Sequence, residues 1–122
     1  MSQTFYLLLH LLGLVLLIAG LAGVSIHAAN GGTKSGSNTR GLTAAMHGLG
    51  AFLLLLGGFG MLAKMGIMSD LPGWVWAKLV IWLLLGGAIV LPYRKPRSAR
   101  LALGLVLLLV AAAAWLALYK PF

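Results

Sequence analysis

The 122-residue chain contains no cysteine, and its only acidic residue is Asp70. Without cysteine the chain forms no disulfide, no thiolate metal site and no thioether-linked haem. Charged residues make up only 8% of the sequence, far below the average for globular proteins. Asp70 is expected to cap the third predicted helix or to pair with Lys64 rather than to act in catalysis. This composition argues against a water-soluble globular domain.

Long apolar segments take the place of charge, because 61% of the residues are hydrophobic. Four runs approach or exceed the roughly 20 residues that cross a hydrocarbon core, where backbone groups are satisfied only in helices. We predict an all-α integral membrane protein, a single antiparallel bundle of four transmembrane helices at residues 5–27, 42–67, 73–92 and 99–119. The first run has no basic residue at its start, which favours a retained helix over a cleaved signal peptide.

The net charge of +8 is concentrated in two predicted loops rather than spread over a surface that could bind nucleic acid. The cations of these loops are Lys34, Arg40, Arg94, Lys95, Arg97 and Arg100. The positive-inside rule places them in the cytoplasm, next to anionic lipids, and so places both termini outside a bacterial-type inner (cytoplasmic) membrane. An aromatic belt is expected at the outer boundary, from Phe5, Tyr6, Trp74, Trp76, Trp115, Tyr119 and Phe122.

The first two predicted helices share a frame of histidine and glycine, H-x-L-G-x-x-L-L-x-x-G, at residues 10–20 and 47–57. The frame is explained either by duplication or by chance similarity in a chain rich in leucine and glycine. In both cases each helix presents a histidine beside small residues, which let a neighbouring helix or a flat ligand approach closely. The candidate cofactor-binding residues are therefore His10, Gly13, His47 and Gly50, together with Lys78 of the third helix.

Several unusual side chains are predicted to lie at one depth near the outer face. At a rise of about 1.5 Å per residue, His10, Met61 and Lys78 share a level, whereas His10 and His47 differ by roughly 15 Å. An ionisable residue inside a membrane often marks a site. Imidazole can bind haem iron or copper, thioether sulfur suits Cu(I), and lysine can bind a carboxylate.

The candidate metal ligands are accordingly His10, His47, Met61 and Met65. The large difference in depth disfavours one haem held between the two histidines. Ordinary packing is a simpler explanation for the same residues. Methionine commonly fills gaps in a core, and a lysine such as Lys64 can extend its ammonium group to the membrane interface. A histidine can form a hydrogen bond to a neighbouring helix.

The chain resembles the SirB-like small membrane proteins and, more distantly, CopD-like copper-resistance proteins and HemJ-like protoporphyrinogen oxidases. The resemblance lies in His10, in the string HGLGAFLLLLGG that begins at His47, in PGWVWAKL at residues 72–79, and in the basic third loop. It implies that His10 matches a haem-ligand candidate of the HemJ-like branch and Lys78 a lysine of the third helix. His47 would match the second-helix histidine of the SirB-like group. That group tends to carry an acidic residue shortly after this histidine, where the present chain has Gly50.

The sequence leaves four functions open. The first is a non-catalytic or accessory membrane protein that holds b-type haem or a similar flat redox ligand in its outer half. The second is a structural subunit of a larger respiratory or photosynthetic-type membrane complex, or a homo-oligomer. The third is copper handling through His10, Met61, Met65 and Met68. An oxidase activity is the weakest alternative, kept for the HemJ-like likeness.

Overall fold

The computed structural model describes residues 2–122, and within them the chain is helical apart from short connections. The long helices are α1 (Gln3–Ala29), α2 (Arg40–Met65), α3 (Gly73–Gly87) and α5 (Ala99–Tyr119). Three short helices, η1 (Ala88–Val90), α4 (Leu91–Arg94) and η2 (Pro96–Ser98), join α3 to α5. Four spans, with α3 to α4 as one of them, are long and apolar enough to cross a membrane. The predicted all-α bundle is confirmed, and the chain is a small multi-pass membrane protein.

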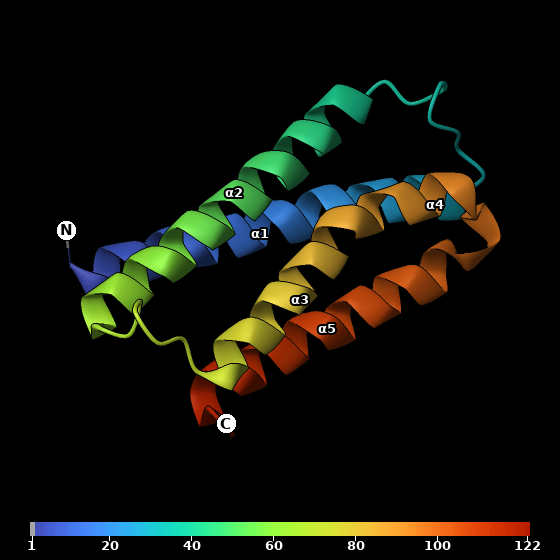
Figure 1. Ribbon diagram of the computed structural model, residues 1–122. Coiled ribbons are helices and arrows are strands. Elements are labelled where there is room, and N and C mark those ends of the chain that lie inside the picture. The colour runs from blue at the N-terminus through green and yellow to red at the C-terminus, as the bar shows by residue number, and fades with distance from the viewer. Residues whose placement is uncertain (1) are drawn as a thin grey trace.

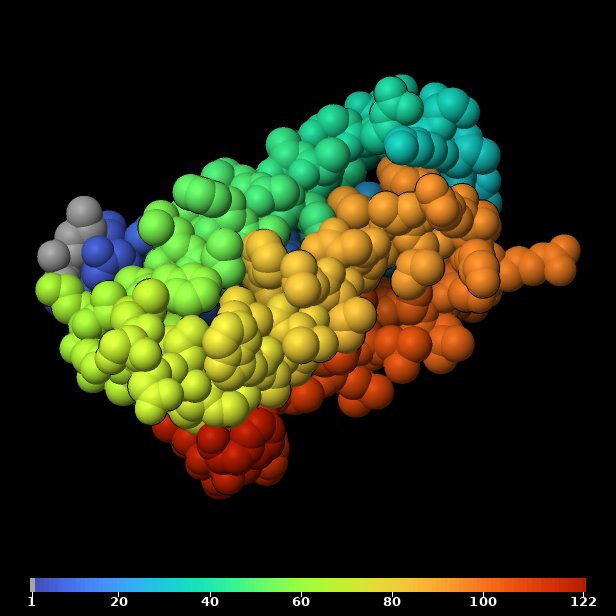
Figure 2. Space-filling view, viewed as in Figure 1, coloured from blue at the N-terminus to red at the C-terminus, as the bar shows by residue number. Residues whose placement is uncertain are grey.

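The bundle consists of two antiparallel helix pairs, α1 with α2 and α3 with α5 (Figure 1). Both chain termini lie at one end, here called the terminal end. The connections at residues 30–39 and 95–98 lie at the other end, here called the basic end because it carries the loop cations. On the face seen in Figure 2, α2 and α3 with α4 cover most of α1. The side of the membrane that each end faces stays a prediction.

The α1–α2 pair is built on glycine. A Cβ placed on Gly57 would lie 2.5 Å from the backbone nitrogen of His10, and one on Gly20 would lie 2.9 Å from that of His47. No side chain fits at such separations, so the two backbones are in direct contact. Each histidine thus lies opposite the second glycine of the other helix, and the repeated frame gives the pair an approximate two-fold relation.

The third span is not one regular helix. It tightens into the 3-10 turn η1 after Gly86 and Gly87, and helical geometry resumes at Leu91 with Pro92 in the first turn of α4. Proline has no N–H to donate to the carbonyl four residues earlier, and glycine is a poor helix former, so the helix changes geometry here. At its start α3 has Pro72 as N-cap with no side-chain hydrogen bond. The expected cap by Asp70 is therefore wrong.

The two helix pairs are joined by two buried clusters, and the larger of them lies in the middle of the bundle. There the indole N–H of Trp82 donates to the carbonyl of Ala51 at 3.0 Å, and Leu17, Leu54 and Leu85 belong to one buried cluster. Over their whole lengths α3 packs mainly on α5 and contacts α2 only sparsely, and toward the terminal end Leu62 of α2 joins Trp74 and Val75 of α3 in a second buried cluster. Beside this second cluster, space remains between the pairs at the terminal end.

Candidate functional site

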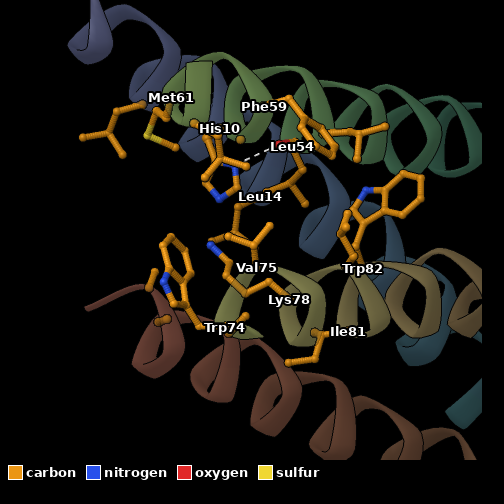
Figure 3. Close-up of a pocket in the computed structure, with 18 of the residues that line it drawn as sticks. His10, Leu14, Leu54, Phe59, Met61, Trp74, Val75, Lys78, Ile81 and Trp82 are labelled. Carbon is orange, nitrogen blue, oxygen red and sulfur yellow. Dashed lines mark hydrogen bonds between the residues drawn. The ribbon is translucent and has the colours of Figure 1, made fainter. Parts of the chain in front are cut away.

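A cavity of about 520 Å³ lies between the two helix pairs at the terminal end. Its volume falls within the roughly 300–1,000 Å³ of ordinary ligand sites. The lining is largely apolar and includes Leu14, Leu54, Phe59, Leu62, Trp74, Val75, Ile81 and Trp82. Figure 3 shows His10 and Lys78 pointing toward each other from opposite walls of this cavity. The imidazole of α1 and the ammonium group of α3 therefore lie in the same apolar cavity.

The His10 ring is held in one orientation. Its Nδ1–H donates to the carbonyl of Leu54 at 2.9 Å, because a carbonyl only accepts. In the neutral ring this leaves the lone pair on Nε2, the nitrogen that faces the cavity. The small residues Gly57 and Gly58 of α2 let α1 approach closely enough for this bond. A ring nitrogen fixed by a backbone carbonyl is the usual arrangement of metal-binding histidine.

Lys78 supplies a cation on the opposite wall. It lies on α3, is half-buried and lines the cavity, which has no acidic residue in its lining. The only acid of the chain, Asp70, is exposed and is not part of the lining. A cation that is partly withdrawn from water in a membrane and has no counter-ion is costly. The cavity is therefore complementary to an anionic group.

A second cation, Lys120, lines the same cavity just beyond the end of α5. Its ammonium donates to the carbonyl of Ala117 at 2.7 Å and lies 5.4 Å from the ring centroid of Trp74. Sequence analysis missed Lys120 because it follows the last apolar run. Its position could have been inferred from the topology. In an antiparallel bundle the end of the fourth span lies at the same membrane boundary as the start of the third span, where Trp74 lies.

The two predicted thioether ligands also reach the cavity. Met61 is half-buried in its wall, and Met65, one turn further along α2, lines it while 39% exposed. Lys64 is exposed and is not part of the lining. The structure thus brings Met61, Met65, His10 and Lys78 to one cavity.

The other predicted site residues lie elsewhere. His47 is buried and does not line the cavity; its Nδ1 lies 3.5 Å from the carbonyl oxygen of Leu17 and its Nε2 3.1 Å from that of Gly86. Both ring nitrogens therefore face acceptors, and neither is directed at open space. Gly13 and Gly50 face helix backbone, since a Cβ on Gly13 would lie 2.6 Å from the carbonyl oxygen of Gly50. These residues form the contacts of α1 with α2 and, through His47, with α3.

The arrangement can hold a flat, mostly apolar molecule that carries negative charge. Phe59, Trp74 and Trp82 offer aromatic surface, the two ammonium groups offer anion binding, and His10 offers a nitrogen lone pair. Among residues 2–122 no group of three or more histidine, cysteine, aspartate or glutamate side chains could hold a metal ion. Comparison with protein families, with characterised proteins and with solved structures found no match to this chain.

Proposed function

We propose that this membrane protein binds b-type haem, or a similar flat redox ligand with carboxylates, in the cavity at its terminal end. His10 would bind the iron through Nε2, and Lys78 would hold a carboxylate. The observation that carries the proposal is the bond from His10 Nδ1 to the Leu54 carbonyl, which leaves Nε2 directed at the cavity opposite Lys78. Bound haem supplies one-electron redox chemistry, and the role is accessory and non-catalytic.

The residues present fit this ligand class in three respects. An apolar macrocycle suits the leucine and aromatic walls, and its two propionates match the two ammonium groups of Lys78 and Lys120. The absence of cysteine excludes thioether-linked haem, so a bound haem would be held non-covalently, as b-type haem is. The protein's own part is to bind and orient the ligand and to exclude water from its face.

The resemblance to SirB-like and, more distantly, HemJ-like membrane proteins supports this proposal, because it relates His10 and Lys78 to residues of those groups. The location we propose is a bacterial-type inner membrane, with the cationic loops in the cytoplasm and both termini outside. On that topology the cavity lies in the half of the bilayer away from the cytoplasm.

An absorption spectrum tests the proposal directly. The protein should be purified in mild detergent from cells supplied with a haem precursor, and a portion should then be titrated with haemin. We expect a Soret band that shifts on reduction and saturates at one haem per chain. A protein that is folded by circular dichroism but shows no saturable Soret band after titration would overturn haem binding.

Copper handling is a second candidate, favoured by the presence of Met61 and Met65 beside His10 in the cavity lining. Thioether and imidazole ligands suit Cu(I). If this is the function, the double variant Met61→Leu and Met65→Leu should bind Cu(I) at least about ten-fold more weakly in competition with a chromophoric chelator. Met68→Leu is the matched control, because Met68 lies outside the lining. Equal Cu(I) affinity in all three proteins would eliminate this candidate.

A further inference from the structure

A second hollow lies on the other half of the bundle, between the third span and α5. It has a volume of about 260 Å³ and is lined on the α5 side by Ala102, Leu105 and Leu109, and on the other side by Leu84 and Ala88. The lining positions recur every three or four residues on both helices, so they form two facing stripes. Ala88 and Ala102 are small, and their size makes the hollow. The result is an apolar groove, separate from the His10 cavity.

Lys95 and Ser98 complete the lining of this groove at the basic end. Arg94 and Arg97 adjoin them in sequence and are exposed. The only acid of the chain, Asp70, precedes α3 near the terminal end, so the polar end of the groove is uncompensated positive charge. Basic pockets beside transmembrane helices suit anionic lipid headgroups.

The length of the groove matches one leaflet of a bilayer. From Ser98 to Leu109 the helix rises about 16 Å, and half of a hydrocarbon core is about 15 Å thick. An acyl chain that starts at the level of Lys95 would therefore end near the bilayer midplane beside Leu84 and Leu109. The positive charge at one end is complementary to an anionic headgroup, and the apolar length below it matches one acyl chain.

We propose that this groove binds one phospholipid with a negatively charged headgroup, held by Lys95 and by the packing of one acyl chain against Ala88 and Ala102. The site is independent of the ligand in the His10 cavity and recognises the lipid by the headgroup charge and the chain together. It is a specific lipid site, in contrast to the general lipid contacts of the other exposed apolar faces.

Native mass spectrometry of the full chain, released from detergent with dioleoyl phosphatidylglycerol or with dioleoyl phosphatidylcholine, tests this proposal. We expect one phosphatidylglycerol to be retained and phosphatidylcholine to be lost. Lys95→Gln should weaken phosphatidylglycerol binding by about five-fold, the effect of one cation near anionic lipid. Ala102→Phe should abolish retention by filling the groove.

Two control variants make the result decisive. Lys64→Gln removes an exposed lysine outside the groove, and Ala111→Phe adds the same ring to an exposed position of α5 that does not line it. Both should bind phosphatidylglycerol like the parent protein. Equal retention of the two lipids, or equal losses in the groove variants and their controls, would overturn the proposal. Circular dichroism of each variant verifies that the helices are intact.

Discussion

Replacement of His10 by alanine is expected to remove the saturable Soret band that haem binding produces. The imidazole Nε2 is the only nitrogen lone pair that we assign to the iron, and its partner bond to the Leu54 carbonyl orients it. Loss of this ligand should lower haem affinity by at least about 100-fold, because loss of a supporting outer contact alone costs about 10–100-fold. Haemin titration followed by absorption measures the effect. Free imidazole should restore part of the band by entering the space that the side chain leaves.

The other two histidines supply the controls for this experiment. His27→Ala removes a ring that bonds the carbonyl of Thr33 at the basic end, and it should leave the Soret band unchanged. His47→Ala should also retain the band, since both nitrogens of His47 face backbone carbonyls outside the cavity. A full band in His10→Ala, or a band lost only in His47→Ala, would contradict the assignment of His10.

Replacement of Gly57 by alanine is expected to cause a large loss of stability. The new Cβ would lie 2.5 Å from the nitrogen of His10 and 2.6 Å from the carbonyl oxygen of Tyr6. Both are backbone atoms, so α1 and α2 would have to separate along the contact. We expect the free energy of unfolding to fall by about 3 kcal/mol, the upper range for overpacking. Unfolding in mixed micelles with increasing dodecyl sulfate measures it.

Gly48→Ala is the matched control, because a Cβ at Gly48 of the same helix meets nothing within 4 Å. Its free energy of unfolding should stay within about 1 kcal/mol of the parent value, with any change toward greater stability, since alanine favours helix over glycine. Gly57→Ala should in addition weaken haem binding, because His10 lies at the disturbed contact. Equal stability of the two variants would contradict the backbone contact that we describe.

The helices and part of the site were predictable because both follow from local rules. The lengths of the apolar runs define the four spans. The fixed rise per residue of a helix then places His10, Met61 and Lys78 at one depth, without any knowledge of packing. The sequence predicts that the third helix ends at Pro92. In the structure the chain instead tightens before Pro92 and resumes helical geometry up to Arg94, since proline is tolerated in a first turn.

The rest of the site depends on how the two helix pairs pack against each other. The spacing of apolar residues along the sequence does not determine this packing. The repeated frame makes His10 and His47 equivalent in sequence, yet a backbone carbonyl of α3 meets His47 whereas a cavity separates His10 from α3. His47 lies 3.1 Å from the Gly86 carbonyl, and His10 faces open space. The glycine grooves were likewise ambiguous between a helix and a ligand, and at Gly13 and Gly50 the neighbour is helix backbone.

The division into two helix pairs has a consequence for how the protein is made. The α1–α2 contact needs nothing from the rest of the chain, because glycine on each helix meets backbone of the other. These first two spans can therefore associate in the bilayer while the ribosome is still adding α3 and α5. The helices α3 and α5 then supply the wall that carries Lys78 and Lys120, so the cavity forms last. The ligand that we propose would therefore bind only after α3 and α5 are in place.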